Sequence, residues 1–297
     1  MEKVQLKGRE DYSLSLAVFP IKKAKAVIQM VHGMQEHKER YYGFIEYLNK
    51  NGYSVVISDM RGHGEDAPLL GHIADKKGED ILIDDQNKIY EYIKENFKDL
   101  PVYLFGHSMG SIIVRVMMQQ YSNNYQKVIL SGYVAPNPIS PVAVLLGNIV
   151  KGFGTKKQSK FLAGLALGPY SKAVKERKTD LDWLSVNEEN VQNYIADPLS
   201  GFPFTSGSFS ALFHLLNNMG KAGRYQNVNK DLPILLAGGE DDPCTAGEKG
   251  RANSKKLLEK AGFSNIEVAT FKGMRHEILN ETDKASVYET MLKFLNK

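Results

Sequence analysis

The alternation of strand-like and helix-like segments restricts this chain to few folds. Short apolar runs occur at residues 3–6, 13–19, 26–31, 53–58, 102–105, 127–131, 233–237 and 266–271. Helical patterns lie between or after them, at residues 38–50, 86–96, 111–121, 249–261 and 285–295. Apolar strands separated by helices are typical of a parallel sheet that is buried on both faces. The sequence therefore predicts an α/β fold with a mostly parallel, eight-stranded sheet flanked by helices, in which the first two segments pair as antiparallel strands.

The alternation stops between about residues 134 and 225. This stretch has helical and loop patterns but no convincing β run, and the α/β pattern resumes after it. No internal repeat is found, so one core with an insertion accounts for the chain better than two tandem domains do. We expect a core made of residues 1–133 and 226–297, with residues 134–225 inserted as a helical unit.

Composition limits the cellular setting and the partners. The 38 basic and 34 acidic residues leave a net charge of +4, and no run of like charges points to nucleic acid. Cys244 is the single cysteine, which excludes an intramolecular disulfide and suits a reducing compartment. The N-terminus lacks the apolar stretch of a signal peptide, and the longest apolar run, residues 141–150, is too short to span a bilayer. These features predict a soluble, cytoplasmic protein.

Residues 106–110 form a Gly-x-Ser-x-Gly motif centred on Ser108. The pattern alone is short enough to arise by chance, but its setting makes it specific. The strand at 102–105 runs directly into it, and an apolar helical segment follows from residue 111. The glycines permit a sharp turn that lifts the serine hydroxyl above the sheet, beside the N-terminus of the helix. We therefore predict that Ser108 is a nucleophile.

A serine hydroxyl needs a base that takes its proton. In α/β enzymes with such a serine, the chain order is serine, then acid, then histidine. Of seven histidines, only His214 and His276 follow Ser108. His214 lies inside the insertion, where a packed or surface imidazole is expected. His276 follows the strand at 266–271, in a loop at the edge of the sheet where ligands gather. The sequence therefore predicts His276 as the base.

The loop after the strand at 233–237 offers three carboxylates, Glu240, Asp241 and Asp242. Asp242 is favoured, because Pro243 restricts the residue before it to an extended conformation and so fixes the direction of its side chain. Asp241 remains an alternative on these grounds. The acid would hold His276 in one tautomer and stabilise the imidazolium as it forms.

A developing oxyanion needs two N–H donors. We expect one from Met109, directly after the nucleophile, and the other from Met34, in the loop after the third strand. His32 and Glu36 of the same loop are expected to brace it. The histidines and acids lack the spacing of metal ligands, so no metal and no cofactor is predicted.

Together these residues resemble the α/β-hydrolase superfamily and, within it, the monoacylglycerol lipase and lysophospholipase (serine aminopeptidase-like) branch. The resemblance covers essentially the whole chain, with a small departure at Ser111, where many relatives carry glycine. The matching motifs are HG-x-x-EH at residues 32–37, ERY at 39–41, D-x-RGHG at 59–64, DPL at 197–199, G-x-x-DP at 239–243 and RHE at 275–277. The acid loop motif favours Asp242 over Asp241.

The resemblance implies that residues 134–225 form a cap over the active site with an acyl pocket, and that the substrate is a single-chain acyl lipid, a monoacylglycerol or lysophospholipid. Its ester would be cleaved through an acyl-enzyme on Ser108. The insertion has the apolar residues for this, although most of them should pack the cap onto the core. They are Val142, Val144, Leu145, Leu146, Phe161, Leu162, Leu165, Leu167, Phe202, Phe204, Phe209, Leu212 and Phe213. Transient contact of the cap with a lipid surface is a further expectation.

Three alternatives stay open. A peptidase of the prolyl-aminopeptidase type would use the same triad with an acidic cap residue, Glu188, Glu189 or Asp197, to hold the substrate ammonium. A thioesterase or acyltransferase would use the triad on another bond. A protein with this fold that only binds ligands would usually lack a member of the triad, whereas this chain has all three. Cys244 is expected to be a packing residue near the site, where thiol reagents would slow the enzyme.

Overall fold

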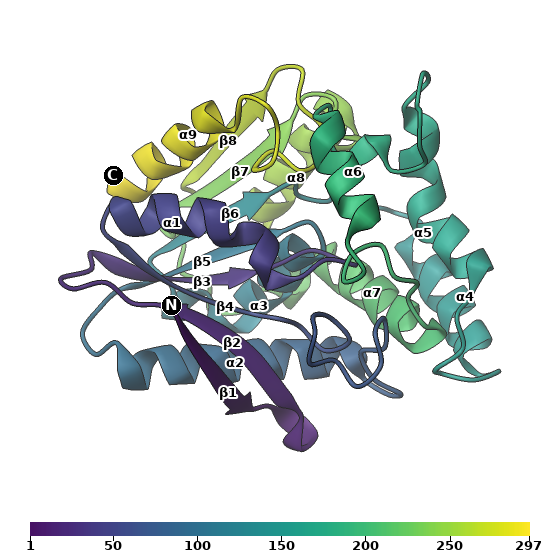
Figure 1. The fold of residues 1–297 in the computed structure, drawn as a ribbon, viewed down its shortest axis with the longest axis horizontal. Coiled ribbons are helices and arrows are strands. Elements are labelled where there is room, and N and C mark those ends of the chain that lie inside the picture. The colour runs from purple at the N-terminus through teal and green to yellow at the C-terminus, as the bar shows by residue number, and fades with distance from the viewer.

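An eight-stranded sheet runs through the computed structural model, which describes residues 1–297 (Figure 1). Its strand order is β1-β2-β4-β3-β5-β6-β7-β8. The strands are β1 (Glu2–Lys7), β2 (Ser13–Phe19), β3 (Ala26–Val31), β4 (Tyr53–Ser58), β5 (Val102–His107), β6 (Lys127–Ser131), β7 (Ile234–Gly239) and β8 (Ile266–Phe271). Only β2 runs against the others, pairing antiparallel with β1 and β4. The predicted mostly parallel sheet and its antiparallel first pair are confirmed.

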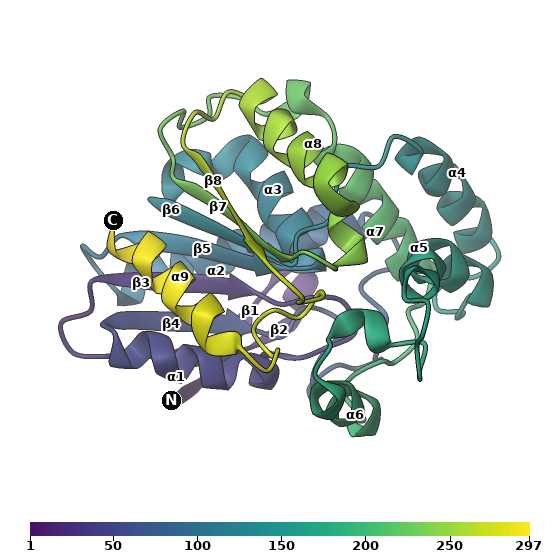
Figure 2. The ribbon, with the colours of Figure 1, turned by 90° about the horizontal axis from the view of Figure 1, so that it is seen from above.

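The middle strands are buried on both faces, which explains their continuous apolar sequences. Every residue of β3, β4 and β7 is buried. Helices α1 and α9 cover one face of the sheet, and α2, α3 and α8 cover the other (Figure 2). Their bounds are α1 (Tyr42–Lys50), α2 (Gly78–Asn96), α3 (Met109–Tyr121), α8 (Gly247–Lys260) and α9 (Lys284–Asn296). Each hydrophobic layer therefore lies between the sheet and one set of helices.

Helix α2 is longer than the sequence pattern predicts, because it begins at Gly78 rather than at residue 86. Its first turns carry acidic residues, which favour a helix N-terminus but hide the apolar period. Ile81 and Leu82 nevertheless face the core, and the buried Asp85 is paired there with the Arg61 guanidinium at 2.5 Å. The charged residues of this pair interrupt the apolar period, so the sequence pattern reveals only the later part of the helix.

Four helices lie between β6 and β7, in the stretch where the sequence shows no strand. They are α4 (Ser140–Lys151), α5 (Lys160–Ala173), α6 (Glu188–Ala196) and α7 (Ser206–Met219). Helix α7 packs on α2 and α3 of the core, and α4 packs on α7. Helices α4, α5 and α6 stand beyond the ends of the sheet strands (Figures 1 and 2). None of the helices in the molecule is long and apolar enough to cross a membrane.

Candidate active site

Ser108 occupies a strained turn between β5 and α3. Its backbone has φ 51° and ψ −118°, in a region that residues with a side chain rarely adopt. The flanking glycines allow the strand and helix to approach this closely. A Cβ at Gly106 would lie 2.5 Å from the Gly110 carbonyl oxygen, and one at Gly110 would overlap the Val31 carbonyl oxygen. The turn therefore presents the Ser108 side chain at the N-terminus of α3.

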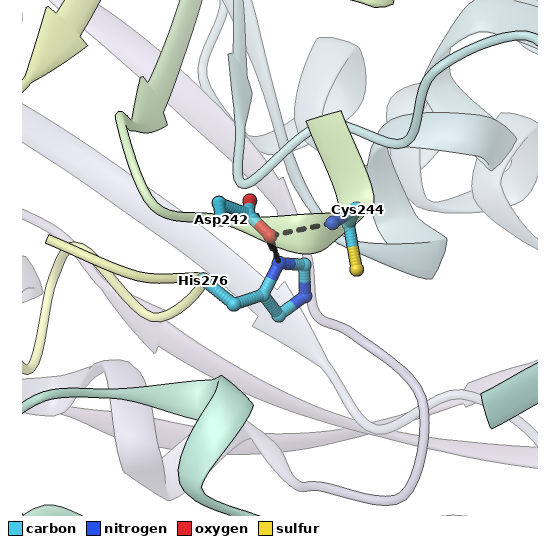
Figure 3. A group of neighbouring side chains, drawn as sticks. All are labelled: Asp242, Cys244 and His276. Carbon is cyan, nitrogen blue, oxygen red and sulfur yellow. Dashed lines mark hydrogen bonds and ion pairs between the residues drawn. The ribbon is translucent and has the colours of Figure 1, made fainter. Parts of the chain in front are cut away.

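Asp242, His276 and Ser108 form a continuous hydrogen-bonded chain. His276 Nε2 lies 2.8 Å from Ser108 Oγ. His276 Nδ1 lies 3.0 and 3.1 Å from the two carboxylate oxygens of Asp242 (Figure 3). The three residues follow the carboxyl ends of β5, β7 and β8 and are 168 positions apart at most. The fold thus brings together the residues that the sequence predicts as nucleophile, base and acid.

His276 is almost fully buried among aromatic rings. The centroid of the Trp183 ring lies 5.0 Å from that of the imidazole, and the His107 ring lies 4.9 Å from it. Burial alone would lower the pKa of His276, but the Asp242 carboxylate, together with the charges of Glu277 and Glu36, raises this pKa above its ordinary value. Burial, aided by His276, lowers the pKa of His107 to about 4, so His107 stays neutral beside the triad.

The alternatives to these residues lie elsewhere. Asp242 caps a short turn after β7, where its carboxylate also accepts a hydrogen bond from the Cys244 N–H at 2.8 Å (Figure 3). Asp241 and Glu240 are exposed on the same loop. His214 lies 3.3 Å from Asn148 within the insertion. The structure therefore places neither rival carboxylate nor the second histidine at Ser108.

Cys244 borders the triad, as the sequence suggests. Its side chain is buried and lines the same cleft as Ser108 and His276. Burial, reinforced by the Asp242 charge, raises the pKa of the thiol well above its usual value. The thiol is therefore protonated and does not compete with Ser108 as a nucleophile.

The loop after β3 is braced as the sequence predicts. Glu36 accepts hydrogen bonds from the Gly33 N–H at 2.5 Å and the Tyr41 hydroxyl at 2.7 Å, and His32 accepts from the Met60 N–H. Between these fixed points lies Met34, whose N–H makes no hydrogen bond within the protein. The Met109 N–H is likewise free of a protein acceptor. Both residues line the cleft that contains Ser108.

A buried ion-pair network, absent from the sequence prediction, joins this loop to the histidine loop. The Arg40 guanidinium pairs with Glu277 through two hydrogen bonds of 2.7 Å and with Glu36 at 2.8 Å. Asn190 of α6 donates to Glu277 as well. Although burial opposes ionisation, Arg40 holds the pKa of Glu277 at about 2. The network therefore fixes the residue next to His276 relative to the loop that carries Met34.

A second link ties the same loop to the insertion. His37 lies between two carboxylates, with Glu39 at 2.7 Å from Nδ1 and Asp197 at 2.6 Å from Nε2. The Tyr194 hydroxyl of α6 donates to the Gln35 carbonyl at 2.7 Å. The insertion is thus anchored to the loop beside Ser108 by charged and polar contacts.

A cleft of about 750 Å³, a volume that includes its open mouth, lies above Ser108. Fourteen of its 21 lining residues are hydrophobic, so it favours an apolar ligand. The insertion supplies much of the wall through Ala166, Leu167, Tyr170, Leu181, Trp183, Leu184, Tyr194, Leu212 and Leu216.

Only two of the apolar insertion residues named from the sequence, Leu167 and Leu212, line this cleft. Phe204, Phe209 and Phe213 are instead buried against the core. The sequence prediction does not include the aromatic wall residues Tyr170 and Trp183. Trp183 lies in a short irregular turn, where no helical period marks it. None of the acidic residues considered for an ammonium group, Glu188, Glu189 and Asp197, lines the cleft.

Comparison with known proteins gives a consistent picture. The family model for "Serine aminopeptidase, S33" matches residues 22–283. The monoacylglycerol lipase of Mycolicibacterium smegmatis is 23% identical over 274 residues, which cover 91% of this chain and 88% of that protein. The mouse monoglyceride lipase is 28% identical over 272 residues, covering 87% and 81%. A carboxyl esterase from Bacillus coagulans, solved in complex with glycerol, superimposes with a TM-score of 0.92 at 24% identity, covering 99% and 97%. The chain therefore belongs to the serine aminopeptidase S33 family and is a serine hydrolase with the α/β-hydrolase fold.

Proposed function

We propose that this enzyme hydrolyses the ester of a single-chain acyl lipid, a monoacylglycerol or a lysophospholipid, with Ser108, His276 and Asp242 as its catalytic triad. The observation that carries the proposal is the 2.8 Å contact between His276 Nε2 and Ser108 Oγ at the base of an apolar cleft. A base at this distance can take the hydroxyl proton as the oxygen attacks a carbonyl carbon.

The reaction follows from this geometry in two halves. His276 accepts the Ser108 proton while Oγ attacks the ester, and Asp242 stabilises the imidazolium that results. The proton then passes to the departing alcohol, which leaves an acyl group on Ser108. Water enters, gives its proton to His276 and attacks the acyl carbon. The fatty acid leaves, and Ser108 regains its proton from His276.

The oxyanion of both halves would be held by the N–H groups of Met34 and Met109. Two observations support this assignment: neither group has an acceptor within the protein, and both residues border the cleft at Ser108. The N-terminus of α3 adds a favourable dipole at the same place. Since Glu36 fixes the Gly33 N–H, the loop that carries Met34 is held ready before substrate binds.

The apolar wall supports the substrate class. We infer that residues 134–225 act as a cap whose inner residues contact the acyl chain, since ten of them line the cleft over Ser108. Relatives named as monoacylglycerol lipases, and a similar esterase bound to glycerol, favour a small polar head group on that chain.

A hydrolysis panel tests the substrate class and the acyl wall together. Monoacylglycerols and lysophosphatidylcholines of graded chain length would be compared with acetate esters and aminoacyl amides. In the variant Leu167→Trp, we expect kcat/KM for long-chain esters to fall by about 10- to 100-fold with little change for acetate, because a pocket filled by bulk excludes chain carbons. The matched control on the same helix is Phe161→Trp, whose side chain is exposed outside the cleft. Equal losses for long and short esters would contradict the placement of the acyl chain.

The pH profile tests the His276–Asp242 pair. The base must be neutral to accept a proton, so kcat/KM should rise with pH through an apparent pKa above the ordinary 6.5 of histidine. In Asp242→Asn, burial is no longer opposed by the carboxylate, and the acid limb of the residual activity should move to lower pH. The measurement is kcat/KM against pH for both proteins with an ester whose leaving group does not ionise. An acid limb at the same pH in both would argue against the pair.

The outer face of α4 supports contact with a lipid surface. Ile139, Val142, Leu145, Ile149 and Phe153 recur every three or four residues, and each is more than half exposed. Val142, Leu145 and Ile149 therefore lie along one side of α4, with Ile139 directly before the helix and Phe153 shortly after it. Exposed lysines follow it at positions 156, 157 and 160, and cations beside an apolar stripe favour anionic headgroups.

The double variant Leu145→Glu/Ile149→Glu should therefore bind phosphatidylglycerol-containing vesicles at least about tenfold more weakly, because two apolar side chains no longer enter the bilayer surface. Sedimentation with vesicles measures this. The control Val268→Glu changes an exposed apolar residue on β8 and should leave binding as it is. Equal vesicle binding by all three proteins would remove the support for a lipid contact through α4.

The peptidase alternative finds less support in the cleft. The only carboxylates that line the cleft are those of Glu36 and Glu277, and both form ion pairs with Arg40. No free carboxylate is left to hold a substrate ammonium group. Faster cleavage of aminoacyl amides than of esters in the panel would reverse this preference.

A further inference from the structure

Asp242, Cys244 and His276 bring three kinds of metal-ligand atom together at the triad. A carboxylate oxygen, the thiol sulfur and an imidazole nitrogen all lie within 4.8 Å of one another, and all three side chains are buried (Figure 3). The hydrolytic mechanism uses the carboxylate and the imidazole but gives the thiol no role. The Cys244 sulfur points to the same side of Asp242 as the imidazole (Figure 3).

Carboxylate, thiolate and imidazole are the ligands that Zn²⁺ prefers, at bond lengths of about 2.0–2.3 Å in a tetrahedral site. Atoms bound to one such ion lie somewhat less than 4 Å apart, so the three groups need only a small contraction to share it. Cys244 and His276 border the cleft, which gives the ion a path from solvent and leaves room for a fourth ligand such as water.

We propose that Asp242, Cys244 and His276 form an inhibitory site for Zn²⁺. The ion displaces the thiol proton and binds one nitrogen of His276. At Nδ1 it takes the place of the proton that His276 donates to Asp242, and this proton moves to Nε2 of the ring. At Nε2 it replaces the hydrogen bond to Ser108. Either way, His276 can no longer take the Ser108 proton, and hydrolysis stops until the ion leaves. Ions that prefer oxygen ligands, such as Mg²⁺, are not held by the thiolate.

This proposal rests on residues of the proposed triad, but its first test needs no turnover. Ser108→Ala keeps all three ligands and abolishes the nucleophile. Titrating this metal-free variant with Co²⁺, a spectroscopic substitute for Zn²⁺, should produce a near-ultraviolet thiolate-to-metal absorption band in proportion to one bound ion. The band should disappear in Ser108→Ala/Cys244→Ser, and Zn²⁺ affinity measured by calorimetry should fall at least about tenfold.

The second test uses the active enzyme and a short nitrophenyl ester. Micromolar Zn²⁺ should inhibit, EDTA should restore activity, and equal Mg²⁺ should have no effect. The zinc concentration for half inhibition should rise at least about tenfold in both Cys244→Ser and Cys244→Ala, each compared with its own uninhibited rate. Using two replacements guards against one that folds poorly. His214→Gln, which removes a histidine away from the triad, should be inhibited like the original chain.

Three results would overturn the proposal. One is a Co²⁺ complex of Ser108→Ala without the thiolate band, and another is equal zinc sensitivity of the cysteine variants and the original chain. The third is equal inhibition by Mg²⁺ and Zn²⁺. If esters are not substrates at all, the cobalt experiment still decides whether the site exists, so failure of the proposed function and failure of the metal site are separable.

Discussion

Replacing Ser108 with alanine is expected to lower kcat for acyl-ester hydrolysis by about 10⁴- to 10⁶-fold, because the residues of a triad act as a unit and the remaining catalysis comes from binding and the oxyanion donors alone. The backbone strain at φ 51° is the same for alanine as for serine, so the fold should persist. The measurement is kcat with a nitrophenyl ester, together with thermal unfolding of the same samples.

Ser111→Ala provides the matched control for this change. Ser111 lies in the first turn of α3, where its hydroxyl donates a hydrogen bond to the Ser108 carbonyl oxygen at 2.7 Å. Its loss removes one hydrogen bond worth about 1 kcal/mol and leaves the nucleophile in place, so kcat should change by less than about tenfold. Ser108→Ala that keeps more than a hundredth of the original kcat would be incompatible with a serine mechanism.

Arg40→Met should reduce the free energy of unfolding by about 3–5 kcal/mol at neutral pH, because removing one partner of a buried ion pair leaves uncompensated charge in the interior. Glu36 and Glu277 have side chains only 5% and 4% exposed, and Arg40 is their shared cation. Since the loops carrying Met34 and His276 both depend on this network, kcat should fall as well. Chemical denaturation and ester kinetics measure the two effects.

The pH dependence of this loss has a definite sign. Arg40 holds the folded-state pKa of Glu277 at about 2, below its ordinary 4.5, so the stabilisation is full above the unfolded pKa and disappears as pH falls from about 5 toward 2. The difference between Arg40→Met and the original chain should therefore be largest at neutral pH and shrink in acid. The control Arg177→Met breaks an exposed pair with Asp180 and should cost less than about 1 kcal/mol. Similar costs for both variants would contradict the burial argument.

The core of the fold could be predicted because the burial of each strand is visible in that strand's own sequence. Strands such as Ala26–Val31 are buried on both faces and so read as continuous apolar runs, and each is separated from the next by a helix or a turn. The start of α2 could not be predicted in the same way. Its buried Asp85 is neutralised by Arg61, 24 positions earlier in the chain, and this pairing is visible only after folding.

The candidate site likewise contains residues that could be predicted from the sequence and residues that could not. Ser108 and His276 were identified from strand ends and chain order, and the structure brings them within 2.8 Å, although their roles remain predictions. Asp242 was separated from Asp241 only by a proline and a resemblance, because neighbouring loop carboxylates differ in direction rather than in chemistry. The Arg40–Glu277 pair spans 237 positions, and no local pattern reveals such a partner.

The cleft wall shows why apolar content alone is a weak guide to a binding site. The large aromatic residues of α7, such as Phe209 and Phe213, have a helical period because they pack on the core. Trp183 reaches the imidazole of His276 from an irregular turn between α5 and α6, where no period is expected. Periodicity reports which residues are buried, but it does not distinguish a packed interior from the lining of a cavity.

Covalent labelling followed by peptide mapping tests the central claim most directly. The enzyme would be treated with a fluorophosphonate, which reacts with an activated serine, and its peptides would be analysed by mass spectrometry. We expect one adduct per chain, located on Ser108, with ester hydrolysis lost in proportion to labelling and no adduct in Ser108→Ala. An adduct on any other residue, or an unlabelled chain that hydrolyses esters at full rate after treatment, would contradict the assignment of Ser108 as the nucleophile.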